Sequence, residues 1–111
     1  LRVGEEIAGI YILSPLSSIE LDIHAHILPE FRKEHGRNLT AMVFQFFVDS
    51  GYEKLTAQVP VIYPNVISFC KEFAMIEEGI NRLSWLKNGE IHDQIRLGAT
   101  KDEVISLLEG L

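Results

Sequence analysis

The stretch from Ile19 to Gly51 constrains the fold of this chain more than any other. Hydrophobic and polar residues alternate over residues 19–27, and a period of two indicates a β-strand with one buried face. Pro29 has no backbone N–H, so regular strand pairing is expected to end there. Apolar residues then recur at helical spacing over residues 39–47, which predicts a helix with a broad apolar face directly after the strand.

A second strand is expected after the helix, which makes the unit a strand–helix–strand crossover. Residues 55–61, LTAQVPV, read as a central strand parallel to the first, because a strand–helix–strand order favours a right-handed connection between parallel strands. Pro60 lies within this strand and removes a ladder hydrogen bond. The two parallel strands are therefore expected to separate near Pro60.

The turn before the helix is predicted to bind an anion. The free N–H groups and the dipole of a helix N-terminus favour negative charge, and a strand end places them at the surface. Arg32, Lys33 and Arg37 add positive charge in the same turn. We therefore expect a phosphate or pyrophosphate to bind at residues 32–38.

The remaining segments complete a mixed sheet. Residues 5–13 are expected to form a first strand, and a second helix is expected after Pro64 with Asn65 as its N-cap. Two strand-like runs flank Asn88-Gly89, which is a strong hairpin signal, and residues 100–103 have capping-box spacing ahead of a short terminal helix. The order β–β–α–β–α–β–β–α predicts an α/β (α+β) domain with a mixed central sheet and helices on both faces.

Composition narrows the classes of function. The 111 residues fit one domain, and a net charge of −6 argues against general nucleic-acid binding. No apolar run approaches the roughly 20 residues that a membrane-spanning helix needs. Cys70 is the only cysteine, so an intrachain disulfide is excluded and a reducing, cytoplasmic location is favoured. Its apolar neighbours indicate a small core residue rather than a nucleophile.

Three stretches resemble the GNAT superfamily of acetyl-CoA-dependent N-acetyltransferases, and its ribosomal-protein branch most of all. They are HAHILPEFRKEHG at 24–36, NVISFCKEFAMIEEG at 65–79 and RLSWLKNGEIHDQIRLG at 82–98. The resemblance implies one GNAT-like domain over residues 1–111 that lacks the family's usual first strand and the two helices after it. Some bacteriophage proteins associated with virion assembly are also similar, in the LTAQVP and RLSWLKNG stretches.

The resemblance implies a cofactor site and a reaction. Acetyl-CoA would lie in a V-shaped gap between the parallel strands at 19–28 and 55–61, and its acetyl group would pass to an amine of a protein or a small molecule. The pyrophosphate would sit on the turn and helix N-terminus, and Asn65 would touch the pantetheine arm. The implied cofactor-binding residues are Ile27, Leu28, Arg32, Lys33, His35, Gly36, Arg37, Asn38 and Asn65.

The catalytic candidates lie on the first core strand and the second helix. Glu20, Asp22 and His24 share one strand face, where a general base for the amine would fit, although a plain polar face has the same pattern. The resemblance places Ser68 near the sulfur as a proton source for the thiolate. His24 and His26 have a spacing that can chelate zinc, but no third ligand is evident, so no metal is predicted.

Two alternatives to an active enzyme remain open. The family turn carries two glycines where this chain has His35 and Arg37, with Gly36 displaced by one. That departure favours a GNAT-fold domain with reduced catalysis, acting in binding or assembly, for example in phage heads, with a homodimer or virion partner through an exposed sheet edge. A cofactor-independent interaction module is the third reading, and it predicts no groove between 19–28 and 55–61.

Overall fold

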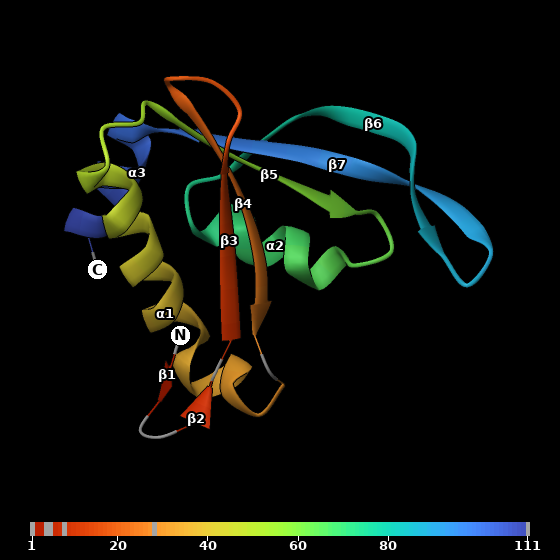
Figure 1. The fold of residues 1–111 in the computed structure, drawn as a ribbon, viewed down its shortest axis with the longest axis horizontal. Helices are drawn as coiled ribbons and strands as arrows, with labels where there is room; N and C mark the ends of the chain where they lie inside the picture. Colours follow the sequence, from red (N-terminus) through yellow and green to blue (C-terminus); the bar gives the residue numbers. More distant parts are fainter. Residues whose placement is uncertain (1, 4–5, 8, 28, 111) are drawn as a thin grey trace.

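The computed structural model describes residues 2–3, 6–7, 9–27 and 29–110, with side chains described for residues 11–24 and 38–110. The chain forms seven strands and three helices in these residues (Figure 1). In chain order they are β1 Arg2–Val3, β2 Glu6–Ile7, β3 Gly9–Pro15, β4 Glu20–Ile27, α1 Pro29–Asp49, β5 Lys54–Pro60, α2 Pro64–Glu72, β6 Ile76–Lys87, β7 Glu90–Thr100 and α3 Lys101–Glu109.

Five strands form one mixed sheet in the order β3-β4-β5-β7-β6. β4 and β5 pair in parallel, and the other neighbours pair antiparallel. This confirms the predicted mixed α/β sheet and the parallel relation of its two central strands. The predicted strand at 5–13 is divided, because β2 pairs with β1 in a separate two-stranded ribbon while β3 joins the main sheet.

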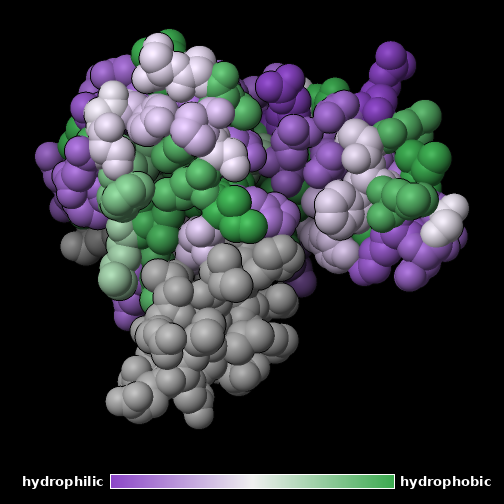
Figure 2. Space-filling model, in the orientation of Figure 1, coloured by the Kyte–Doolittle hydropathy of each residue, from purple (hydrophilic) through white to green (hydrophobic). Residues whose placement is uncertain are grey.

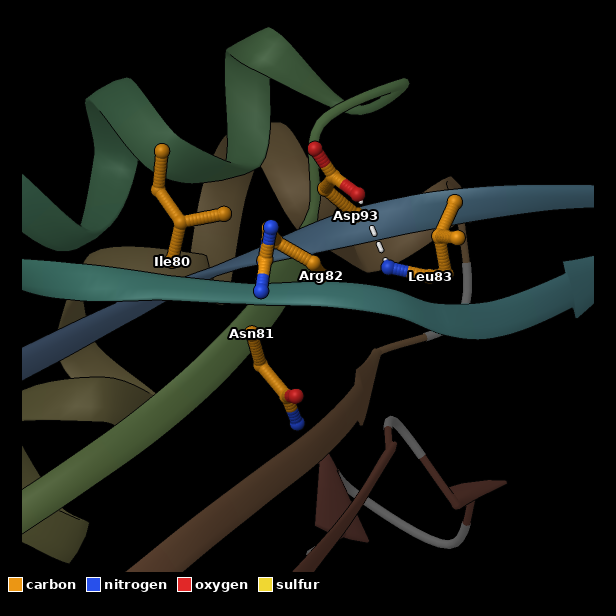
Figure 3. Close-up of a pocket in the computed structure, with 5 residues that line it drawn as sticks. All are labelled: Ile80, Asn81, Arg82, Leu83 and Asp93. Atoms are coloured by element: carbon orange, nitrogen blue, oxygen red, sulfur yellow. Dashed lines mark hydrogen bonds between the residues drawn. The ribbon is translucent and has the colours of Figure 1, made fainter.

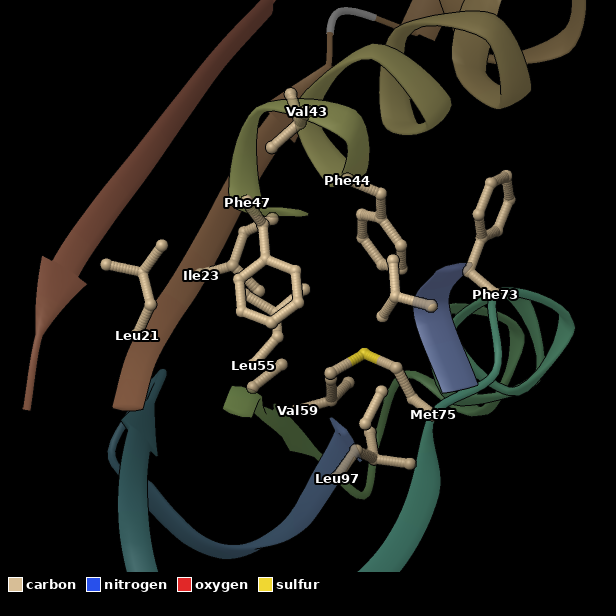
Figure 4. Close-up of a cluster of buried hydrophobic side chains, with 13 residues drawn as sticks. Leu21, Ile23, Val43, Phe44, Phe47, Leu55, Val59, Phe73, Met75 and Leu97 are labelled. Carbon is tan, nitrogen blue, oxygen red and sulfur yellow. The ribbon is translucent and has the colours of Figure 1, made fainter. Parts of the chain in front are cut away.

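The core lies on one face of this sheet. Alternate residues of β4, β5 and β7 meet aromatic side chains of α1 there, and Phe47, Leu55, Leu97 and Val104 are the largest fully buried side chains (Figure 4). Phe44 of α1 packs edge-on against Phe73, just past α2, with ring centroids 5.4 Å apart. Burial of this apolar surface stabilises the layer of helices on the sheet.

All three helices contribute side chains to this single cluster. The prediction of helices on both faces is therefore wrong for the part of the chain that the structure describes. The reason is the alternation in the central strands, which sends apolar side chains toward the helices and polar ones, such as Asp22 and Thr56, to the other face. No helix in the described ranges combines the length and apolarity needed to cross a membrane.

The predicted hairpin and terminal helix are confirmed. Asn88 and Gly89 have φ of 52° and 79°, which the tight turn between β6 and β7 requires. Thr100 and Glu103 form the reciprocal capping box of α3. The predicted cap of α2 is wrong: Tyr63 is the N-cap, and Asn65 lies inside the helix because Pro64 already has the φ of a first helical residue.

The start of the long helix also differs from the prediction. α1 begins at Pro29, so residues 32–38 have helical backbone instead of forming a turn. Proline at the first helical position costs no hydrogen bond, and the chain therefore enters the helix directly after the strand. Pro29 still ends the strand pairing as expected, since β4 stops at Ile27.

Candidate functional site

The two parallel strands separate soon after they meet. β4 and β5 are paired at three positions, and Asp22–Thr56 is the last of them. Beyond it β4 continues to Ile27 beside β3, while β5 continues to Pro60 beside β7 (Figure 1). The separation was predicted, but it begins four residues before Pro60, so the proline is not its first cause.

Asp22 stands at this point of separation, on the face away from the core. The Thr56 hydroxyl donates a hydrogen bond of 3.1 Å to the Asp22 carboxylate. Burial raises the pKa of Asp22, and the Thr56 hydrogen bond acts in the opposite direction. The Asp22 carboxylate is therefore held partly out of water beside the gap between two strands.

Glu20 and His24 share the strand face of Asp22, as the sequence predicted. Glu20 is half-buried and His24 is exposed, while Leu21 and Ile23 between them are buried in the core. The charges of His24 and Arg96 favour the ionised form of Asp22 and lower its pKa, and that of Glu20 raises it. Of the predicted catalytic residues, these three are brought together by one strand.

Polar side chains link the strands of this face. Lys54 of β5 forms an ion pair of 2.5 Å with Glu78 of β6, and Asn81 of β6 donates to Gln58 of β5 over 3.0 Å. Both contacts reach across β7. Gly98 permits the first, because a Cβ there would overlap the side chains of Glu78 and Lys54. Neither pair was predicted, because no local sequence pattern relates residues more than 20 positions apart.

Ser68 and Asn65 lie elsewhere, on α2. Both side chains are exposed, while Phe69 and Cys70 of the same helix pack against the core. α2 belongs to the layer on the core face of the sheet, and Asp22 faces the opposite side. The predicted catalytic residues are thus divided between the two sides of the sheet, and the point where β4 and β5 separate lies between them.

Most of the predicted cofactor residues lie outside the part of the chain whose side chains the structure describes. Ile27 is the last residue of β4, and Leu28 lies outside the described residues. Arg32, Lys33, His35, Gly36 and Arg37 are part of the α1 backbone, and their side chains also lie outside the described set. Asn38 is exposed. Among the side chains that are described, no three or more of His, Cys, Asp or Glu gather as metal ligands would.

A hollow of about 680 Å³ opens on the β6–β7 hairpin, away from the strand gap. Ile80, Asn81, Arg82, Leu83 and Asp93 line it (Figure 3). The Leu83 backbone N–H donates to Asp93 over 2.8 Å, and Leu83 has a positive φ of 50° at an irregularity of β6. Asp93, one of the residues that carried the resemblance, therefore fixes the shape of the edge strand.

Several exposed aliphatic side chains lie on this hairpin. Ile80, Leu83, Leu86 and Ile91 are each at least 59% exposed, and hydrophobic surface is visible at the hairpin end of the molecule (Figure 2). Exposed aliphatic residues in a group of this kind are typical of contact surfaces.

Comparison with known proteins finds similar structures but no similar sequences. No family model matches the chain, and no curated protein is detectably similar in sequence. Among solved structures, the chain is similar to spermidine N-acetyltransferase from Vibrio cholerae in complex with CoA and spermine, with a TM-score of 0.85 at 20% identity over 93% of this chain and 63% of that one. It is also similar to the ribosomal-protein-S18-alanine N-acetyltransferase from Escherichia coli, with a TM-score of 0.79 at 16% identity over 89% of this chain and 64% of that one.

A chimera of the Vibrio cholerae spermidine N-acetyltransferase with hSSAT matches as well, with a TM-score of 0.85 at 20% identity. It is covered over 65% of its length by 92% of this chain. The chain thus spans less than two thirds of the length of each of these three structures. The protein has the GNAT fold, as its sequence predicted.

Proposed function

We propose that this protein transfers an acetyl group from acetyl-CoA to an amine of a protein or a small molecule. The observation that carries the proposal is the separation of β4 and β5 directly after the Asp22–Thr56 pair. It leaves a half-buried carboxylate at the edge of a gap between two parallel strands, where an amine and a thioester can meet from opposite sides of the sheet.

In the proposed reaction, Asp22 attracts the acceptor ammonium and takes one of its protons. The freed amine nitrogen attacks the thioester carbonyl carbon, a C–N bond forms and the C–S bond breaks. As the amide forms, its nitrogen gives up a second proton. The departing thiolate takes a proton from the Ser68 hydroxyl on α2, the proposed source, and the proton from the nitrogen replaces the one that Ser68 gives. Glu20 and His24 flank Asp22 on the same strand face and are the alternative bases.

Acetyl-CoA supplies the activated acetyl group, and this chain's own residues would bind and orient it. The proposed contacts are backbone N–H groups near Ile27 and Leu28 for the carbonyl oxygen, Asn65 for the pantetheine arm, and the start of α1 with Arg32, Lys33 and Arg37 for the pyrophosphate. The free N–H groups of α1 are those of its first turn, directly beyond β4, so the helix backbone supports a pyrophosphate at the start of α1, and Arg37 lies about two turns further along the helix.

The similar structures support acetyl transfer in general. They are N-acetyltransferases, one of them in complex with CoA and spermine. They include an enzyme acting on a polyamine and one acting on a protein, so both kinds of amine belong in a substrate screen. The assembly alternative, a phage source and a virion partner gain no support from these structures and are not proposed.

The test combines binding with turnover. Titration calorimetry with acetyl-CoA and with CoA should detect binding, and a panel of polyamines and peptides should reveal acetyl transfer. Asp22→Asn should lower kcat by about 10²–10⁴-fold, the range for loss of a general base. Asp49→Asn, which changes an exposed carboxylate at the end of α1, is the matched control. Absence of acetyl-CoA binding by the folded protein at millimolar concentration would overturn the proposal.

A further inference from the structure

We propose that Thr56 is a positioning residue, which orients the Asp22 carboxylate at the strand gap and keeps it in the proton-accepting form. The inference rests on the proposed function, in which Asp22 is the base. It assigns a role to Thr56, which no pattern in the sequence singled out.

The structure holds the Thr56 hydroxyl against the Asp22 carboxylate. It is 8% exposed and lies in the last parallel pair with Asp22, directly before the two strands separate. Its hydroxyl donates to Oδ1 of Asp22 over 3.1 Å. A β-branched residue in a strand has restricted χ1, so the donor is held in place before any ligand arrives.

The charged groups near Asp22 lie on three strands, β4, β5 and β7. Glu20 and His24 lie on β4 itself, Lys54 lies on β5 beside Glu20, and Arg96 lies on β7. On the other side, β3 places Ser14 opposite Asp22. Among the described interactions of the Asp22 carboxylate, the direct hydrogen bond comes from Thr56. His24, Arg96 and Glu20 affect the Asp22 pKa by electrostatic interaction.

Removal of the Thr56 hydroxyl should leave the effect of burial on the Asp22 pKa opposed only by the charges of His24 and Arg96. Burial raises the pKa of Asp22 and the Thr56 hydrogen bond lowers it. In Thr56→Val the side chain keeps its branched shape and loses the donor, so the Asp22 pKa should rise above that of the wild type. Thr56→Ser restores a hydroxyl and should return the pKa toward the wild-type value.

The first measurement is a carbon-13 NMR titration of the Asp22 carboxyl in the free protein. The midpoint should move upward in Thr56→Val and return in Thr56→Ser. Thr40→Val is the matched control, because Thr40 is a second buried threonine whose hydroxyl pairs with Tyr11 on the helix side of the sheet. An unchanged Asp22 midpoint in folded Thr56→Val would overturn the inference.

The second measurement is the pH profile of acetyl transfer. The acid limb should move by the same amount as the NMR midpoint, and at low pH the rate should fall by the ratio of the two acid dissociation constants. A shifted NMR midpoint together with no acetyl transfer by the wild type would overturn the proposed function and leave the Thr56–Asp22 relation standing. A shifted midpoint with an unmoved acid limb would overturn the role of Thr56 in the reaction.

Discussion

The Lys87 ammonium donates a hydrogen bond of 2.6 Å to the Tyr63 hydroxyl and lies 4.8 Å from the centroid of its ring. This contact ties the end of β6 to the residue that precedes α2. The pairing of β7 with β5 runs from Thr100 to Gln94, so the hairpin extends past the end of β5. A side-chain contact therefore helps to hold this two-stranded extension against the rest of the domain.

Replacing Lys87 with Met should loosen the hairpin and leave the sheet intact. The contact is exposed, so its loss should cost on the order of 0.5–1 kcal/mol. Hydrogen exchange of amides in residues 84–92 should accelerate a few-fold, while amides of β4 and β5 remain unchanged. Tyr63→Phe, which keeps the ring and removes the acceptor, should give a similar effect. Unaltered exchange in both variants would contradict the role of this contact.

Asp22→Asn should stabilise the protein while it impairs catalysis. Burial raises the Asp22 pKa in the folded state, so ionisation of this carboxyl costs more there than in the unfolded chain. The folded state binds the extra proton, and stability declines as pH rises from the ordinary value of 3.8 through the raised pKa. Asparagine avoids that cost and can still accept the Thr56 hydrogen bond.

Thermal unfolding at two pH values checks this sign. At pH 7 the Asp22→Asn protein should melt above the wild type, and below pH 3.8 the difference should shrink because the wild-type carboxyl is protonated in both states. A lower melting temperature of the variant at pH 7 would show that the Asp22 charge is stabilising after all.

Ala74→Gly should also stabilise the fold. Ala74 follows α2 with a φ of 66°, in the left-handed region that costs a residue with a Cβ about 1–2 kcal/mol. Glycine removes that strain. Its more flexible unfolded chain costs roughly 0.5–1 kcal/mol of stability in return, so the free energy of unfolding should rise by up to about 1 kcal/mol. Chemical denaturation measures it, and Ala57→Gly in β5 should destabilise. A loss of stability in Ala74→Gly would contradict the expectation.

Cys70 should react slowly with thiol reagents in the folded protein. Burial raises the pKa of its thiol to about 11 from the ordinary 9.0. At pH 8 the thiolate fraction is then about one in a thousand, roughly a hundredfold below that of an unperturbed thiol. Alkylation rates with and without denaturant test this directly. Rapid alkylation of the native protein would mean that Cys70 is more accessible and more acidic than its packing indicates.

Arg32→Ala should weaken CoA binding by about 1–3 kcal/mol, the usual cost of losing charged hydrogen bonds to phosphate. Calorimetry with CoA is the measurement, and the expected loss should diminish at high salt. Arg82→Ala on the hairpin is the matched control, because it removes the same charge from the edge strand. Equal CoA affinity of the wild type and Arg32→Ala would place the pyrophosphate elsewhere.

Much of the fold could be predicted because its signals are local. The alternation around Leu21 and Ile23, the Asn88-Gly89 turn and the Thr100–Glu103 capping box each depend on neighbours a few residues apart. The helix boundaries were less predictable. Asn65 lies inside α2 because the helix already begins at Pro64, and the residues expected to form a turn after Pro29 are helical.

The sequence by itself determined the strand face that carries Glu20, Asp22 and His24, because a period of two fixes which side chains share a side. Only the tertiary structure decided that Asp22 meets Thr56 at the last pair before the strands separate, and that Lys54 reaches Glu78 above Gly98. Asp22 and Thr56 are 34 positions apart in the sequence, and Lys54 and Glu78 are 24 positions apart. Their meeting depends on the register of β4, β5, β7 and β6, and packing against the single apolar core sets that register.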